Sequence, residues 1–216
     1  MKSFFEIIKM VANEPYSGIE NNISSFVDVE KSTINAINRA HNYIWNLHNF
    51  PFKNSYLDFK TVAGQSSYEA CLGNILNIKL DNANLKLIND PDNFAFEIGL
   101  GKPQSFYLDF TTDNRKIVLY KTPDNSYDVR VKFETFMSIK GLDGSLKQSF
   151  ELKDDKLNLP PEIEPLYLNC LTAKSVCYLL NDVSDENYAP YDKAFTDAYQ
   201  NLINLSGVKT NTLIII

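Results

Sequence analysis

The chain has 216 residues, of which 44% are hydrophobic and 22% are charged, and its formal net charge is −6. This composition excludes dominant disorder, and the length suits one domain or one domain with an insertion. Three Cys are too few, and odd in number, for a disulfide framework, so we expect reduced thiols. No stretch reaches the roughly 20 apolar residues that span a bilayer, and Glu6 and Lys9 interrupt the apolar N-terminal segment. We therefore expect an unprocessed, soluble chain with no membrane association.

The basic residues argue against a protein that reads nucleic acid. There are 18 Lys but only three Arg, which are scattered along the sequence as Arg39, Arg115 and Arg130. Affinity for nucleic acid depends on the number of phosphates neutralised, and Arg makes the bidentate contacts. If an acidic chain of this kind contacts DNA, we expect it to do so without binding it tightly.

Two amphipathic helices are predicted at the N-terminal end, over residues 3–12 and 29–48. Ser3 suits the N-cap of the first helix, and Pro15 lies just beyond its end. The second helix stops before Asn49-Phe50-Pro51. The side chains at helical spacing, which predict the buried faces, are Phe4, Ile8 and Val11 in the first helix and Ile34, Ile37, His41, Ile44 and Trp45 in the second.

From Ser55 the hydrophobic period changes to two, which is typical of half-buried antiparallel strands. Turn sequences such as Asp113-Asn114 and Asp143-Gly144 punctuate this region. The alternating sets are Leu57 and Phe59; Leu76, Ile78 and Leu80; Phe94, Phe96 and Ile98; Phe106, Leu108 and Phe110; Ile117 and Leu119; and Val129, Val131 and Phe133. These sets predict a β-rich region over residues 55–156.

Two further helices are predicted after the β-rich region. The third opens at Pro160-Pro161-Glu162, with Pro near the first helical position and acidic residues in the first turn. The fourth becomes regular near Pro190 and ends at Gly207, and a β-prone apolar tail, residues 208–216, follows it. The predicted apolar faces are Ile163, Leu166, Cys170, Ala173, Cys177 and Leu180 in the third helix and Tyr191, Phe195, Ala198, Leu202 and Leu205 in the fourth.

The predicted fold class is α+β. We expect a discontinuous helical bundle, built from two N-terminal and two C-terminal helices, with an inserted antiparallel β domain. The corresponding segments are 1–54 for the N-terminal helices, 55–156 for the β domain, 157–207 for the C-terminal helices and 208–216 for a C-terminal arm.

No motif in the sequence supports catalysis, a cofactor or a metal site. His41 and His48 are separated by about 10 Å of helical rise, so one metal ion cannot join them, and we expect both to pack around Trp45 or to lie at the helix end. The segment 64–67 lacks the second Gly of a serine-hydrolase turn, and 99–101 lacks the third Gly of a dinucleotide loop. We therefore expect a protein that is not an enzyme and that has no cofactor.

The end of the C-terminal tail, Leu213 to Ile216, is too apolar to be left in water and too short to form a core. Either it packs against its own domain, or it docks onto another chain as an added strand. The residues alone leave both alternatives open.

The order of several features is more specific than any one of them. These features are Phe4 to Ile8, Thr33 to Ala40, Ile44-Trp45, Phe50-Pro51-Phe52, Phe59 to Tyr68, Tyr127 to Phe136 and Leu157 to Pro160, followed by a closing helical hairpin. In this order they resemble the head-to-tail connector (adaptor) proteins of short-tailed bacteriophages, of the tail tubular protein A type. The resemblance covers nearly the whole chain.

This resemblance implies a structural virion protein at the head–tail junction, present in the host cytoplasm during assembly. The implied state is a ring, expected to hold about twelve subunits, that docks on the portal protein, carries the tail nozzle or next ring protein and surrounds the DNA exit channel. DNA would pass through the lumen without specific binding. By this analogy the arm that reaches the portal or a neighbouring subunit consists of Thr210, Asn211, Thr212, Leu213, Ile214, Ile215 and Ile216.

Other functions remain open on the sequence. One is another ring or gatekeeper subunit further down the tail, which differs from the connector only in its partner. Another is a non-viral module that binds a carbohydrate or a peptide, which would be a monomer with a concave aromatic cleft. An enzyme would require a perturbed pair of carboxylates.

Overall fold

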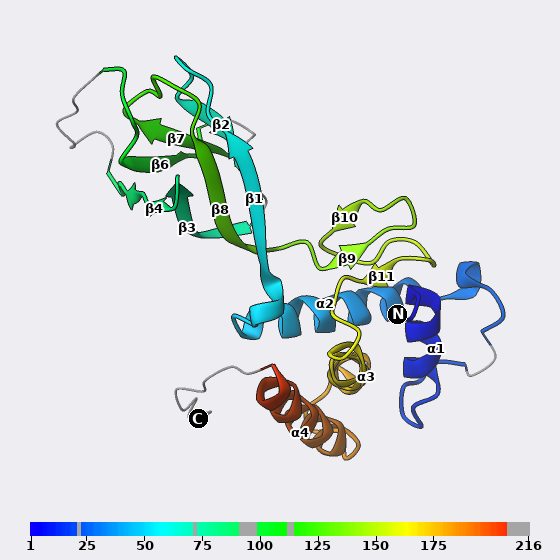
Figure 1. The fold of residues 1–216 in the computed structure, drawn as a ribbon. Helices are drawn as coiled ribbons and strands as arrows, with labels where there is room; N and C mark the ends of the chain where they lie inside the picture. Colours follow the sequence, from blue (N-terminus) through cyan, green and yellow to red (C-terminus); the bar gives the residue numbers. More distant parts are fainter. Residues whose placement is uncertain (21–22, 71–72, 91–98, 112–114, 207–216) are drawn as a thin grey trace. The chain divides into compact units, whose positions relative to one another are not determined.

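The computed structural model describes residues 1–20, 23–70, 73–90, 99–111 and 115–206, and the description that follows is confined to them. The protein is mixed α+β, with four α-helices and several antiparallel sheets (Figure 1). The chain forms two compact units: Met1–Lys53 with Met137–Ile216, and Asn54–Phe136. We call them the helical unit and the β unit.

The four helices of the helical unit are α1 (Phe4–Ala12), α2 (Lys31–Leu47), α3 (Glu164–Leu180) and α4 (Tyr188–Leu205), with short 3₁₀ turns at Phe26–Asp28 and Pro51–Lys53. All four were expected from the hydrophobic period. The third begins later than predicted, because residues from Pro160 to Ile163 form a turn and Pro165 occupies the first helical turn. The fourth begins two residues before Pro190, whose missing N–H costs nothing in a first turn.

Helix α1 begins with a reciprocal cap. The backbone N–H of Ser3 donates to Glu6 Oε2 at 2.7 Å, and the N–H of Glu6 donates to Ser3 Oγ at 3.3 Å. The next two N–H groups, of Phe4 and Phe5, donate to the carbonyls of Asp155 and Lys153 at 2.7 and 3.0 Å. The N-terminal N–H groups that a helix leaves unpaired are therefore satisfied here, partly by a segment 150 residues away in sequence.

One hydrophobic core joins the four helices. Helix α3 packs against α1, α2 and α4 and is buried on most of its circumference, as expected for a central helix (Figure 1). Fully buried members of this core include Phe4, Ile8, Ile37, Ile44, Ile139, Phe150, Leu157, Tyr167, Leu171 and Leu202.

A small three-stranded sheet also belongs to the helical unit. Its order is β10 (Leu146–Lys147), β9 (Ile139–Lys140), β11 (Lys156–Leu157), and all pairs are antiparallel. The sequence placed this stretch in the β domain, since 55–156 read as one β-rich region. The structure groups it with the helices because Ile139, Phe150 and Leu157 are buried in the helical core.

The β unit contains two four-stranded sheets. The first has the order β1 (Asn54–Lys60), β8 (Asp128–Thr135), β3 (Gly73–Leu80), β4 (Ala83–Asn84), and the second β2 (Ser67–Glu69), β7 (Lys116–Tyr120), β6 (Ser105–Asp109), β5 (Lys86–Leu87). All pairs are antiparallel except β5 with β6. The two sheets share a core of Ile78, Leu80, Leu85, Phe106, Ile117, Leu119, Val129 and Val131.

Leu76 and Phe110, from the predicted alternating sets, are exposed and lie outside this core. Leu76 is 49% exposed because the pairing of β3 with β8 shifts between Ile75 and Asn77, a bulge that moves one residue out of the alternation. Phe110 is 66% exposed because β6 ends at Asp109. The predicted strand of Phe94, Phe96 and Ile98 lies outside the described residues, as do residues 208–216.

Candidate functional site

His41 lies in a buried polar cluster of the helical unit. Its Nε2 is 2.6 Å from Ser138 Oγ and its Nδ1 is 2.9 Å from the Tyr167 hydroxyl. All three side chains are at most 1% exposed. Burial lowers the pKa of His41 to about 3 and raises that of Tyr167 well above its usual value, so the ring and the phenol are neutral at physiological pH.

A neutral imidazole donates from one nitrogen and accepts at the other. Every group is satisfied when the Tyr167 hydroxyl donates to Nδ1 of His41, Nε2–H donates to Ser138, and the Ser138 hydroxyl donates to the carbonyl of Gln148, 3.4 Å away. A Ser–His pair of this kind could resemble a nucleophile and its base, but neither side chain is accessible to a substrate. The cluster instead ties α2 to α3 and to the start of β9. Sequence reasoning expected His41 to be packed, as it is, but gave no sign of its partners.

Lys53 is a second buried polar residue, 4% exposed. Its ammonium donates to the carbonyls of Trp45 at 2.9 Å and His48 at 3.1 Å, and it lies 5.6 Å from the centroid of the Trp45 ring. These carbonyls belong to the last turn of α2, where the helix dipole favours a cation. Lys53 therefore holds the turn that follows α2, immediately before β1 begins.

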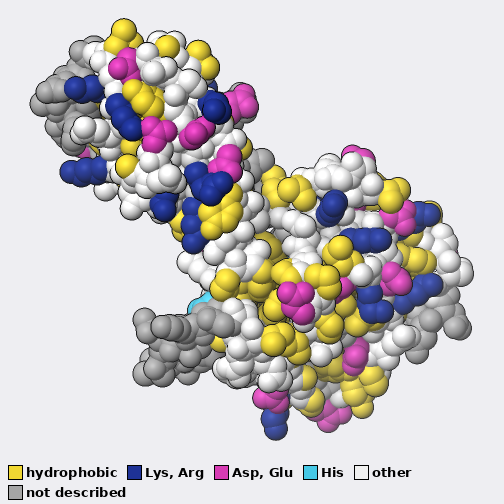
Figure 2. Space-filling view, in the orientation of Figure 1, with side chains coloured by type: hydrophobic (Ala, Val, Ile, Leu, Met, Phe, Trp, Pro, Cys, Tyr) yellow, Lys and Arg dark blue, Asp and Glu magenta, His cyan; other side chains and the backbone are white. Residues whose placement is uncertain are grey.

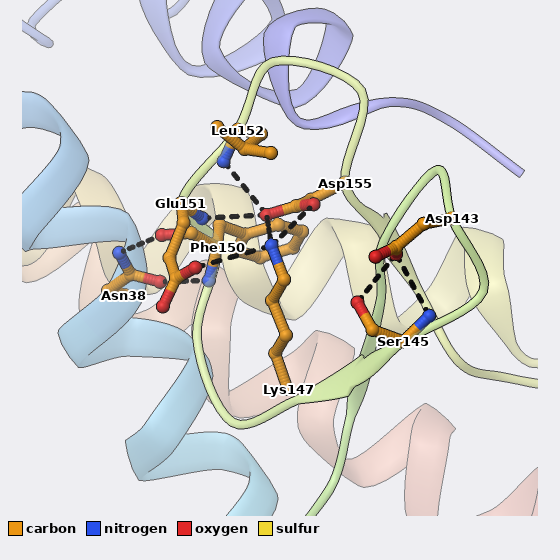
Figure 3. A network of polar contacts seen from close by, with 8 residues as sticks. All are labelled: Asn38, Asp143, Ser145, Lys147, Phe150, Glu151, Leu152 and Asp155. Atoms are coloured by element: carbon orange, nitrogen blue, oxygen red, sulfur yellow. Dashed lines mark hydrogen bonds and ion pairs between the residues drawn. The ribbon is translucent and has the colours of Figure 1, made fainter.

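A third network fixes the loop between β10 and β11 (Figure 3). Oδ2 of the fully buried Asp155 accepts the backbone N–H groups of Glu151 and Leu152, each at 2.8 Å, and Lys147 Nζ lies 3.3 Å from its Oδ1. Asn38 of α2 pairs with both backbone groups of Phe150, at 3.0 and 2.9 Å. These contacts hold the loop whose carbonyls receive the N-terminus of α1.

Metal and thiol chemistry has little support in the part of the chain that is described. There, no group of three His, Cys, Asp or Glu side chains could hold a metal ion. Cys170 and Cys177 are free and buried, and burial raises the pKa of Cys170 to about 12, so that thiol stays protonated. Among the described helices, none has both the length and the apolar character needed to cross a bilayer.

The outer face of the first sheet of the β unit carries the most distinctive exposed surface. Tyr56, Asn77, Lys79, Arg130 and Lys132 line a hollow of about 410 Å³. We call these five residues the basic face. They come from β1, β3 and β8, and Figure 2 shows Lys and Arg side chains gathered over this region beside hydrophobic ones.

The strand register sets the neighbours within the basic face. On β8, Arg130 stands opposite Asp58 of β1 on one side and Lys79 of β3 on the other; Lys132 likewise stands between Tyr56 and Asn77. Arg130 is bound by both oxygens of Asp58, at 2.8 and 2.9 Å, which holds the pKa of Asp58 below its usual value. The described residues offer no hydrogen bond or ion pair to Lys79 or Lys132.

A larger hollow of about 600 Å³ adjoins the basic face and has a different charge balance. Its lining is Asp58, Phe59, Lys60, Lys79, Asp81, Asn82, Asp128, Val129 and Arg130. Here Lys60 pairs with Asp128 at 3.3 Å, and Asp81 accepts from Lys102 at 2.7 Å. Three carboxylates and three cations therefore line this hollow, which shares Lys79 and Arg130 with the basic face.

Among the residues on which the sequence resemblance rests, the aromatic ones at the end of α2 and just after it form a cluster. Trp45, Phe50 and Phe52 pack together in the helical unit, with ring centroids of Phe50 and Phe52 at 4.9 Å and of Trp45 and Phe52 at 5.9 Å. The predicted partner-binding arm, residues 210–216, lies outside the described residues.

Exposed apolar side chains occur on both units. The most exposed are Val27 (89%), Leu142 (80%), Val183 (77%), Leu100 (69%) and Phe110 (66%). They are spread over several loops, and single exposed apolar residues are normal on a protein surface. They do not define a site.

Comparison with known proteins adds no family. No protein-family model matches the chain, and no curated protein matches it significantly.

Proposed function

We propose that the protein is a head-to-tail connector subunit of a short-tailed bacteriophage. In this proposal it is a structural virion protein that forms a ring, docks on the portal, links it to the tail and surrounds the DNA exit channel. The observation that carries the proposal is the order of sequence features that resembles this family. The order begins with the segment 4–8, passes through Phe50-Pro51-Phe52 and ends with the segment 157–160 and the helical hairpin after it.

The arrangement of the elements supports the proposal. For a connector of this family we expect a discontinuous helical bundle with an inserted β domain. Residues of α1, α2, α3 and α4 share one core, and a single stretch of chain, Asn54–Phe136, forms the β unit. The segment Phe50-Pro51-Phe52 lies where the chain leaves the helices for β1.

The buried polar clusters and the net charge are also consistent with a structural role. The polar clusters around His41, Lys53 and Asp155 are buried and satisfied by the protein's own groups, so they stabilise the helical unit and offer nothing to a substrate. An acidic chain suits a channel through which DNA must slide, because few counterions are released and most phosphates are not held.

The contacts of the ring would include the C-terminal arm, residues 210–216. An extended apolar segment can add a strand to another chain, where its backbone hydrogen bonds give affinity and its Ile and Leu side chains give buried area. Because a ring repeats each contact, modest contacts combine into a stable assembly.

The experiment that tests the proposal is a mass measurement, by light scattering or native mass spectrometry. The purified protein is measured alone and then mixed with the portal protein of the same virus. A ring that binds portal, or an assembly that forms only with portal, supports the connector. A protein that stays monomeric and ignores the portal contradicts it.

The alternatives give different results in the same measurement. Another ring or gatekeeper subunit would form a ring but would not bind portal. A non-viral module that binds a carbohydrate or a peptide would stay monomeric. The two hollows of the β unit give it weak support, because each is lined by a single aromatic side chain, Phe59 in the larger and Tyr56 in the smaller.

A further inference from the structure

The two lysines of the basic face, Lys79 and Lys132, have no carboxylate partner among the described residues, whereas Arg130 is paired with Asp58. Lys79 stands directly opposite Arg130 across β3 and β8, and Lys132 follows Arg130 two residues along β8, roughly 6.6 Å away. Like charges directly opposite each other destabilise a sheet. The register therefore places three cations close together, two of them directly opposite each other.

No carboxylate of the described residues lines the hollow of the basic face. Asp58, the carboxylate nearest to it, is held by Arg130 through two hydrogen bonds. Glu134 comes next on the same side of β8 but is only 4% exposed and does not line the hollow. The adjoining hollow, by contrast, is lined by three carboxylates, Asp58, Asp81 and Asp128, and its Lys60 lies 3.3 Å from Asp128.

An exposed aromatic ring accompanies the cations. Tyr56 is 59% exposed, stands opposite Lys132 in the register, and lies with its ring centroid 5.9 Å from the Arg130 guanidinium. Cations that follow a strand beside an aromatic platform are the arrangement by which proteins bind nucleic acid without reading sequence: the cations contact phosphates and the ring stacks on a base. Nucleic acid supplies a ligand for both parts of this surface, phosphates for the cations and the face of a base for the ring.

We propose that the basic face binds the phosphodiester backbone of nucleic acid, independently of sequence. The inference does not depend on the connector proposal, which requires only that DNA pass through a channel. With two or three phosphates contacted, binding is weak and depends on salt: the logarithm of the affinity falls against the logarithm of salt concentration with a slope of roughly −2 to −3.

The test is fluorescence anisotropy with a short labelled oligonucleotide, as a single strand and as a duplex, over a series of low to moderate salt concentrations. The double variant Lys79→Gln/Lys132→Gln should bind more weakly, and its salt slope should be smaller by about 1 for each lysine removed. The matched control is Lys140→Gln/Lys153→Gln, which makes the same charge change on exposed lysines of the helical unit. It should bind as the unchanged protein does.

A third variant separates the two forms of the ligand. Tyr56→Ala should weaken binding of the single strand and leave duplex binding nearly unchanged, since only an unpaired base can stack on the ring. All three variants change side chains outside the buried core, and circular dichroism verifies that each is folded.

Three results would overturn the inference. The first is no binding of either oligonucleotide at low salt. The second is an equal loss in both lysine double variants, because the effect would then be one of net charge alone. The third is unchanged oligonucleotide binding combined with a change of oligomeric mass in Lys79→Gln/Lys132→Gln, which would assign the basic face to an acidic surface of a second copy.

Discussion

At the scale of single residues, several polar side chains of the helical unit are buried and form their hydrogen bonds with other protein groups. His41 is the clearest case, because its two ring nitrogens join Ser138 and Tyr167, which are 97 and 126 residues away in sequence. The ring must be neutral to fill this role. A proton added to it would place an uncompensated charge in the core.

The stability of the protein should therefore fall as the pH is lowered through the range in which His41 titrates. In the unfolded chain the ring takes up a proton below about pH 6.5, whereas in the folded protein it does so only near pH 3. Between these values the unfolded state binds one more proton than the folded state. Protonation of the unfolded chain at His41 therefore makes the free energy of unfolding about 2 kcal/mol lower at pH 5 than at neutral pH. This stabilising contribution is complete above about pH 6.5 and is lost progressively toward pH 3.

Urea unfolding of the unchanged protein and of His41→Gln, each across this pH range, measures the effect. The carboxylates titrate in both proteins, so the difference between them isolates the imidazole. We expect His41→Gln to be less stable at neutral pH, and we expect the difference to narrow as the pH falls. A difference that is constant with pH would show that His41 is not held neutral.

Lys53 leads to a second expectation at this scale. Lys53→Met keeps an apolar side chain of similar length beside Trp45 but removes the donor to the carbonyls of Trp45 and His48. The loss should be roughly 1–3 kcal/mol of unfolding free energy, measured by chemical denaturation. Lys31→Met, at the exposed first turn of the same helix, is the control and should be nearly neutral. Equal effects of the two substitutions would contradict the capping role.

At the scale of the elements, the carboxylate of Asp155 makes more of the contacts that hold the loop between β10 and β11 than any other side chain, with Asn38 and Lys147 adding to it. Asp155→Ala removes the acceptor of the Glu151 and Leu152 N–H groups and frees the segment whose carbonyls receive the N-terminus of α1. We expect a cost of about 1–3 kcal/mol and faster hydrogen exchange at the start of α1. The adjacent Asp154→Ala matches it in chemistry and should cost less than about 0.5 kcal/mol. Unchanged exchange in Asp155→Ala would show that the loop does not hold α1.

The most specific prediction of the connector proposal concerns the C-terminal arm. Deletion of residues 210–216 should abolish docking onto portal, measured by co-sedimentation, while the monomer keeps its circular dichroism spectrum. A variant of unchanged length, with Leu213, Ile214, Ile215 and Ile216 all replaced by Ser, should behave like the deletion. Docking that survives both changes would rule out the arm as the portal contact.

The sequence predicted elements well where a local pattern determines them. The capping of α1 by Ser3 was visible because the cap and its partner Glu6 are three residues apart. The start of α3 was missed because Pro160 can open a helix or a turn, and only packing decides between them. The exposure of Leu76 was missed for a similar reason, since a bulge is set by the partner strand and not by the strand's own alternation.

The candidate sites were much less predictable. The pairing of His41 with Ser138 and Tyr167 joins residues from three distant segments, and no local pattern encodes it. The basic face was hidden for the same reason: Lys79, Arg130 and Lys132 are unremarkable in sequence and become a cluster only when β3 pairs with β8. The scattered Arg residues argued against nucleic acid, but scatter along the chain says nothing about proximity in a sheet.

At the scale of the whole molecule, the net charge of −6 is an average over surfaces that differ in sign. The basic face is positive within an acidic chain, and the adjoining hollow is nearly balanced. Long-range repulsion of DNA by the chain and local attraction at one sheet face can therefore coexist, and the ionic strength determines which dominates.

The division of the chain also sets the order in which it can fold during synthesis. The β unit is one continuous stretch, Asn54–Phe136, and leaves the ribosome complete, whereas α1 and α2 emerge first but lack the central helix α3 until residues 164–180 have been made. The apolar side chains of α1 and α2, such as Phe4, Ile37 and Ile44, thus have no α3 to pack against while more than half of the protein is translated. Nascent chains in this interval are the ones that a chaperone would bind and that would aggregate in its absence.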